Sequence, residues 1–170
     1  MDSVAAALIG VALIAQEPAS PWWKPPVVVT VRPVASVSST VDVAIRNSTP
    51  NPLVAPIQAT FRLTPVTKAE DPRPSETSTL TSLFDPTADT VTDAAGGDVQ
   101  LRLPVGGTRR VRVNLTKLKW SLTPPLYVWV PRPLSQVADY QEYDLTLEVV
   151  LRGMAWPWVT SKPIRIRLAR

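Results

Sequence analysis

Glu142 and Asp144 form the carboxylate pair of this chain that comes nearest to a catalytic arrangement. At positions i and i+2 of an extended segment, both side chains lie on one face, as paired acid chemistry on a glycosidic bond requires. Asp139 and Glu142 form a second, looser pair. The strand-like sequence around them, which begins near Tyr140 and Tyr143, favours a solvated strand start instead. We therefore predict no catalytic residues.

The chain contains no histidine and no cysteine among its 170 residues. It therefore lacks the commonest general base, a thiol nucleophile, thiolate metal ligands and a disulfide framework. Asp85, Asp89 and Asp93 recur every four residues, without the glycine and the spacing of a calcium loop. The glycine pairs at 96–97 and 106–107 match no phosphate-binding loop. We predict that the protein is not an enzyme and has no cofactor or metal site.

Two triplets, Asn47-Ser48-Thr49 and Asn114-Leu115-Thr116, fit the glycosylation pattern. The pattern has meaning only in a secreted eukaryotic protein, and Asn114 falls within a predicted strand. We therefore expect neither asparagine to carry a glycan.

Alternating apolar and polar residues run through most of the chain and predict β-strands. The predicted strands span residues 27–34, 40–46, 57–63, 98–104, 109–115, 126–131, 143–153 and 163–169. No segment between them has the 3.6-residue period of an amphipathic helix, and 19 prolines indicate many short elements. We predict an all-β fold: an antiparallel two-sheet sandwich of about eight strands, a jelly roll in preference to an immunoglobulin-like topology.

Residues 64–97 interrupt this pattern with a long acidic loop, whose apolar patch at Leu80–Phe84 could anchor it through a short strand or a helical turn. Residues 65–98 carry a formal charge of −5 and the rest of the chain +9. We predict one β-sandwich domain at 27–170, preceded by an N-terminal arm and a Pro/Trp linker at 1–26. A basic body of this kind can contact nucleic acid or anionic lipid, although arginines on solvated strand faces are the simpler explanation.

The N-terminal segment contains twelve uncharged, mostly apolar residues, Val4 to Ala15. As a helix these residues span about 18 Å, which is short of the ~30 Å hydrocarbon layer of a bilayer. The acidic Asp2 also stands where a signal peptide carries positive charge. We expect a retained apolar arm that packs against its own core, a neighbouring subunit or a membrane surface.

Six tryptophans against two phenylalanines is an unusual ratio. Tryptophan is favoured where one edge of the ring is apolar and the other is wet. We predict Trp120 and Trp129 in the core, whereas the near-pairs at 22–23 and 156–158 suit an interface or the ends of the sandwich. The candidate interface residues are Leu8, Ile9, Leu13, Ile14, Trp22, Trp23, Trp156 and Trp158.

In its size, its high proline content, its lack of cysteine, its strand pattern and its N-terminal arm, the chain resembles the small single-jelly-roll major capsid proteins of tailless, internal-membrane phages of Thermus. The resemblance implies a structural virion protein, a capsid subunit that self-assembles through its β-sandwich and its arm. The partners it implies are further copies, a second structural protein and a membrane surface, with no specific nucleic acid. The alternative is an exported binding or accessory β-sandwich module of the cell envelope or periplasm of a thermophilic bacterium.

Overall fold

The computed structural model describes residues 24–34, 37–66, 79–88, 99–123, 131–138, 142–154 and 158–168. These residues form eleven strands, one short α-helix and one 3-10 turn. The elements are β1 (Val27–Val34), β2 (Val37–Asn47), β3 (Leu53–Pro65), β4 (Thr79–Phe84), β5 (Val99–Leu103), β6 (Thr108–Asn114), η2 (Leu115–Lys117), β7 (Lys119–Thr123), β8 (Arg132–Pro133), α1 (Leu134–Val137), β9 (Glu142–Leu151), β10 (Trp158–Thr160) and β11 (Ile164–Arg167).

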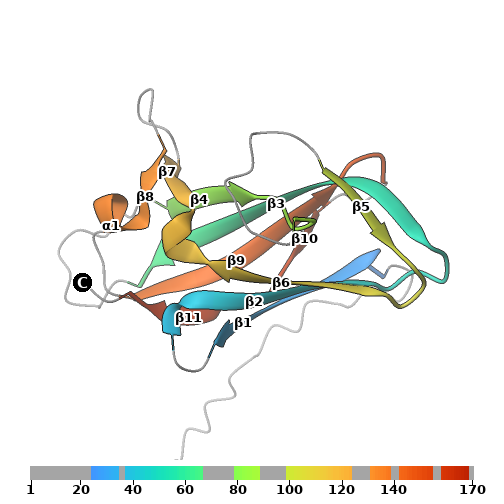
Figure 1. Ribbon diagram of the computed structural model, residues 1–170, viewed down its shortest axis with the longest axis horizontal. Coiled ribbons are helices and arrows are strands. Elements are labelled where there is room, and N and C mark those ends of the chain that lie inside the picture. Colours follow the sequence, from blue (N-terminus) through green and yellow to red (C-terminus); the bar gives the residue numbers. More distant parts are fainter. Residues whose placement is uncertain are drawn as a thin grey trace, which may run out of the picture.

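The strands form two antiparallel sheets that face each other (Figure 1). The three-stranded sheet has the order β1-β2-β6, and the eight-stranded sheet runs β10-β9-β3-β4-β7-β8. In the latter, β11 also pairs with β9, and β5 pairs with the first part of β3. The long strand β3 is the centre of this sheet, because it pairs with β9 along one edge and with β5 and β4 along the other. The predicted all-β sandwich with antiparallel pairing is therefore confirmed.

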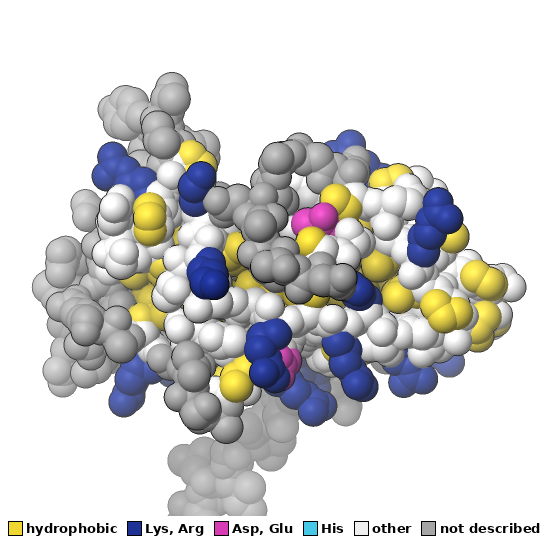
Figure 2. Space-filling view, viewed as in Figure 1, with side chains coloured by type: hydrophobic (Ala, Val, Ile, Leu, Met, Phe, Trp, Pro, Cys, Tyr) yellow, Lys and Arg dark blue, Asp and Glu magenta, His cyan; other side chains and the backbone are white. Residues whose placement is uncertain are grey.

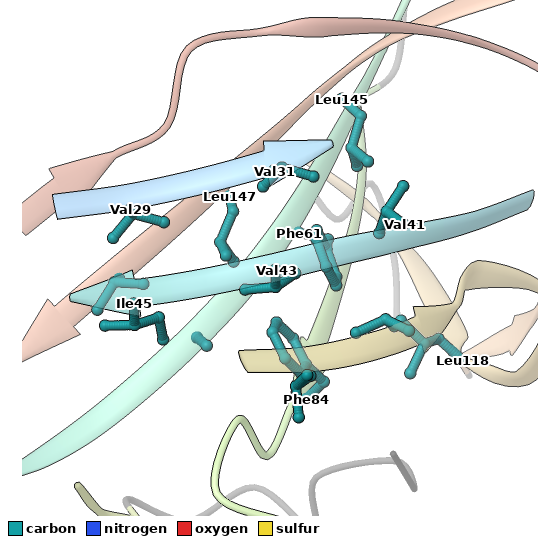
Figure 3. Close-up of a cluster of buried hydrophobic side chains, with 14 of the residues drawn as sticks. Val29, Val31, Val41, Val43, Ile45, Phe61, Phe84, Leu118, Leu145 and Leu147 are labelled. Carbon is teal, nitrogen blue, oxygen red and sulfur yellow. The ribbon is translucent and has the colours of Figure 1, made fainter. Parts of the chain in front are cut away.

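The core lies between the two sheets and is built from alternate residues of each strand (Figure 3). Val29 and Val43 from one sheet and Leu147 from the other are buried, as the two-residue period of the sequence predicts. Phe61 and Phe84 stack with ring centroids 4.6 Å apart. Burial of each large apolar side chain stabilises the fold by about 1.5–3 kcal/mol, so this shared layer holds the sheets together.

Trp120 is fully buried, as predicted, and the indole N–H donates a hydrogen bond to the Leu115 carbonyl at 3.0 Å. This bond satisfies the single polar group of the ring inside an apolar layer. The bond also ties β7 to the 3-10 turn that precedes it.

The turn between β5 and β6 contains Gly106 and Gly107. Gly106 adopts a φ of +65°, which favours glycine. A Cβ atom on Gly107 would lie 2.6 Å from the Pro104 ring, so a side chain does not fit there without a shift. Through this turn the chain passes from the eight-stranded to the three-stranded sheet.

The structure corrects several sequence predictions. Strand β3 extends beyond the predicted strand at 57–63, from Leu53 to Pro65, so its end enters the predicted acidic loop at 64–97. Within that loop the apolar patch forms strand β4, the short strand that was one of the two predicted alternatives. Strands β7, β8 and β10 were not predicted, because a run of two to five residues carries too little periodicity to indicate a strand. Strand β2 begins at Val37, three residues before the predicted strand at 40–46.

Three further predictions fall wholly or mostly outside the described residues. Of the predicted strand at 126–131, the structure describes Pro131 alone, which is not in a strand, and Trp129 is among the remainder. Residues 67–78 and 89–97 of the acidic loop and residues 1–23 of the arm and linker also lie outside the described residues.

Candidate functional site

Trp158 is the one candidate interface residue among those that the structure describes. It lies in β10 directly opposite Val150 of β9, and 71% of its surface is exposed. Because paired residues of two strands point to the same side, Trp158 projects from the outer face of the eight-stranded sheet. The other seven lie outside the described residues: Leu8, Ile9, Leu13, Ile14, Trp22, Trp23 and Trp156. The interface role of all eight stays a prediction.

The carboxylate pair Glu142 and Asp144 points outward from β9 and is bound by two arginines of β11. The Nε of Arg165 donates to Asp144 Oδ1 at 2.7 Å, and the ion pair raises the pKa of Arg165. The Nη2 of Arg167 donates to Glu142 Oε1 at 2.5 Å. These contacts are those of a cross-strand ion-pair ladder on a solvated sheet surface.

No group of three acidic side chains within the described part of the chain is placed to hold a metal ion. Asp85 instead accepts hydrogen bonds from the backbone N–H and the hydroxyl of Thr87, at 2.7 and 2.6 Å. Asp89 and Asp93 lie outside the described residues. Over the same described ranges, no helix is both long and apolar enough to cross a membrane.

The two Asn-x-Thr triplets are turn motifs in this fold. In 47–49 and in 114–116, the Asn Oδ1 accepts hydrogen bonds from the backbone N–H and the hydroxyl of the threonine two positions later. Asn47 is 1% exposed, and its amide nitrogen donates to the carbonyls of Asn51 at 2.8 Å and Pro104 at 3.0 Å. The Asn47 amide is therefore not accessible to glycosylation in the folded chain.

The outer face of the three-stranded sheet gathers arginines from all three of its strands, and we call this surface the basic face. Its rows, read across β1, β2 and β6, are Arg32–Asp42–Arg112, Thr30–Ala44–Arg110 and Val28–Arg46–Thr108. All these side chains point away from the core, because the residues between them along each strand are buried. Four arginines thus share this face with one carboxylate.

A single ion pair neutralises one of the four arginines. Arg112 donates to Asp42 through two bonds, Nε to Oδ1 at 2.7 Å and Nη2 to Oδ2 at 3.1 Å. The hydrogen bond from Arg112 holds the pKa of Asp42 below its usual range. Within the part of the chain that the structure describes, no carboxylate pairs with Arg32, Arg46 or Arg110.

A hollow of about 610 Å³ lies over the centre of the basic face. It forms because Ala44, with its small side chain, is surrounded by longer neighbours. The residues that line its rim and floor include Thr30, Arg32, Asp42, Ala44, Arg110 and Arg112. The hollow exposes the guanidinium groups of Arg32 and Arg110, which no carboxylate of the described residues pairs with. This arrangement suits an anionic ligand.

Over β3, β5, β9 and β11, the opposite outer face is closer to neutral. On β3, β5, β9 and β11 the outward charged residues are four arginines and three carboxylates. Three ion pairs form there, since Arg62 also lies 3.6 Å from Glu148. Over these four strands the opposite face therefore has a formal net charge of +1, against +3 on the basic face, although each set has four arginines.

The described residues as a whole are strongly basic. They contain fifteen Lys and Arg and five Asp and Glu, a formal net charge of +10, whereas the remaining segments contain three and nine, or −6. Figure 2 shows many Lys and Arg side chains and few acidic ones on the side that it presents. The sequence predicted a basic body, but it did not predict which strand faces would lie side by side.

Comparisons of the chain with protein-family models, with curated proteins and with solved structures found no match. The sequence signal for the basic face was present as outward arginines in three predicted strands, at 32, 46, 110 and 112. What the sequence lacked was the pairing of those strands.

Proposed function

We propose that this protein is a non-catalytic β-sandwich module that lies on an anionic lipid surface through its basic face. The observation that carries the proposal is the unequal neutralisation of the two outer faces. One face pairs three of its four arginines with carboxylates, and the other leaves Arg32, Arg46 and Arg110 without such partners among the described residues.

The shape of the basic face supports a planar partner. Three adjacent strands give a surface about 10 Å wide at their usual spacing, and its arginines project in one direction. Each arginine near an anionic membrane contributes about 1 kcal/mol to the free energy of membrane binding. Three unneutralised arginines therefore supply about 3 kcal/mol, or roughly a hundredfold in affinity. Val28, 45% exposed on the same face, adds an apolar contact.

The strand order supports an immunoglobulin-like topology. In such a topology the sheet β1-β2-β6 would take the places of strands A-B-E, and β4-β3-β9 with β10 and β11 those of C′-C-F-G. Immunoglobulin-like modules are common on cell surfaces, so we place first the exported cell-envelope module, which would contact lipid headgroups from outside the bilayer.

The second candidate is the structural virion protein, a capsid subunit. The apolar segment at 4–15, which needs a surface to bury against, favours this role. A shell built over an internal membrane would use the basic face in the same way. Trp158 lies on the opposite outer face, so in either setting it would serve a different contact.

Vesicle co-sedimentation tests the lipid contact. We expect the full chain to bind vesicles that contain phosphatidylglycerol and to bind phosphatidylcholine vesicles far more weakly. The triple variant Arg32→Gln, Arg46→Gln and Arg110→Gln should lose about a hundredfold in affinity for the anionic vesicles. The matched control is Arg62→Gln, Arg102→Gln and Arg165→Gln, which removes the same charge from the opposite face and should retain most of the binding.

Three outcomes would contradict the proposal. Equal losses in the two triple variants would mean that net charge, and not the basic face, drives binding. Equal binding to neutral vesicles would assign the contact to apolar segments such as the arm, which all the variants retain. Tighter binding to duplex DNA than to vesicles, with the same dependence on the basic face, would assign the face to nucleic acid.

A further inference from the structure

Strand β1 ends the three-stranded sheet with an edge that pairs with no other described strand. The Ser48 N–H donates to the Pro26 carbonyl at 3.0 Å, at the point where β1 and β2 begin to pair. In an antiparallel ladder the hydrogen-bonded pairs alternate with non-bonded pairs. The backbone groups of even-numbered β1 residues therefore face β2, and those of Val27, Val29 and Val31 face the free edge.

Pro33 agrees with this assignment. It lies in β1 at an odd-numbered position, where its missing N–H would have pointed to the free edge. Proline is tolerated in strands at such edge positions. The free edge thus presents three complete pairs of N–H and C=O groups, at Val27, Val29 and Val31, and stops at Pro33.

The other free strand edges in the described part of the chain belong to strands that are shorter or more highly charged than β1. Strand β6, at the other end of the same sheet, carries Arg110 and Arg112 beside its free edge, which discourages pairing. Strand β8 has two residues and β5 has five. Strand β1 has eight residues, and Arg32 is its only charged residue. A long, β-branched edge of this kind is a site for strand pairing.

We propose that two copies of this chain pair β1 with β1, antiparallel, about a two-fold axis through Val29, and so join their three-stranded sheets into one six-stranded sheet. In this register Val29 lies opposite Val29 of the second copy, and Val27 lies opposite its Val31. The backbone N–H and C=O groups of Val27, Val29 and Val31 in the two copies then form about six N–H···O bonds.

The sequence of β1 is self-complementary in this register. Val28 lies opposite Thr30 of the second copy on the outer face, a β-branched pair that stabilises antiparallel sheets. Arg32 lies opposite Pro26, so no like charges face each other. Pro33 lies opposite Pro25, and the ladder ends where both chains lack a donor. These features favour a second copy over an unrelated strand as the occupant of the edge.

The pairing also has a geometric consequence. A two-fold axis that relates antiparallel neighbours is perpendicular to the sheet, so the outer faces of both copies lie on the same side. The two basic faces become one surface with twice the charge. This arrangement goes beyond the lipid contact and does not depend on it, because it can be measured without lipid.

Solution mass and a register-specific cross-link test the pairing. We expect the full chain to form a dimer by analytical ultracentrifugation, in the absence of lipid. Val28→Lys combined with Thr30→Lys places like charges opposite each other in both halves of the pair and should weaken the dimer at least about tenfold. The matched control, Thr40→Lys with Thr108→Lys, adds the same charge to the same face away from the β1 edge and should leave the dimer intact.

The chain has no cysteine, so introduced thiols report on the register without interference. Residues 28 and 30 of different copies form a non-hydrogen-bonded pair, whose Cα atoms are about 4.5 Å apart, within the range of a disulfide. A mixture of Val28→Cys and Thr30→Cys proteins should therefore cross-link under mild oxidation. A mixture of Val28→Cys and Thr108→Cys proteins should not.

A chain that stays monomeric would overturn the proposal. So would a dimer that survives the β1 lysine variant or lacks the 28–30 cross-link, because it would use another surface. Circular dichroism of each variant, with the β-sheet spectrum of the wild type as reference, separates loss of pairing from loss of folding. Failure of vesicle binding with an intact dimer would contradict the lipid contact alone.

Discussion

Replacement of Asn47 by alanine should destabilise the sandwich at the end where its two sheets are connected. The Asn47 side chain joins the β2–β3 connection, through the Asn51 carbonyl, to the β5–β6 turn, through the Pro104 carbonyl. The chain passes between the sheets at both of these places. The backbone N–H of Asn47 adds a bond to the Gly107 carbonyl at 2.9 Å, which the substitution leaves in place.

The expected magnitude follows from the bonds that are lost. Truncation removes two short hydrogen bonds donated by the side chain and two accepted from Thr49, all at 2.8–3.0 Å, together with a longer one donated to the Leu103 carbonyl at 3.5 Å. At about 1 kcal/mol net per bond, with some relief from water at the partly buried carbonyls, the loss is about 3 kcal/mol. That is a large part of a total stability of about 5–15 kcal/mol. For a chain of this length it lowers Tm by roughly 6–12 °C.

Asn114→Ala is the matched control, because Asn114 forms the same local turn in a more exposed position. The Asn114→Ala substitution should lower the free energy of unfolding by about 1 kcal/mol, the usual value for a capping side chain. Denaturant unfolding followed by tryptophan fluorescence measures both variants, since Trp120 is buried in the folded state. The reasoning is refuted if Asn47→Ala loses no more stability than Asn114→Ala.

Two further predictions concern Asp42 and Ser82. Asp42→Asn removes the one carboxylate of the basic face and frees Arg112, so binding to anionic vesicles should rise about fivefold; weaker binding would contradict the role of this face. Because the Asp42 pKa is lowered in the folded state, its ion pair stabilises the fold above about pH 4 and loses this effect as the pH falls through the folded pKa. The small stability deficit of Asp42→Asn at neutral pH should therefore vanish in acid. Ser82 is 3% exposed, and its hydroxyl has no hydrogen-bond partner among the described residues. Ser82→Ala should therefore raise the unfolding free energy by about 1 kcal/mol or leave it unchanged. A decrease of more than about 1 kcal/mol would mean that the hydroxyl has an unrecognised partner.

Much of the fold could be predicted because strand periodicity is a local property. The predicted strand at 27–34 coincides with β1. In the predicted strand at 40–46 the alternate residues Val41, Val43 and Ile45 are buried, as its alternation of apolar and polar residues indicates, and so are Ile57 and its alternate neighbours along β3. A side chain's place on a strand follows from its own sequence neighbours, since successive residues point to opposite faces.

Short strands could not be predicted in this way. Strand β10 has three residues and β7 has five, and each is a strand because a longer neighbour supplies its hydrogen-bond partners. Strand β4 was predicted only as one of two alternatives, a short strand or a helical turn, because it lies between segments rich in acidic and turn-forming residues. The existence of such elements depends on contacts between residues far apart along the chain.

The sequence by itself determined the all-β class, the inward side of each long strand and the excess of arginine. Tertiary structure decided which arginines are neutralised. Arg165 is paired because β11 lies beside the acidic residues of β9, whereas Arg32 and Arg110 lie on the three-stranded sheet, where Asp42 is the only outward carboxylate. An ion pair acts over a few ångströms across neighbouring strands, so the charge of a face depends on strand order, which no local pattern contains.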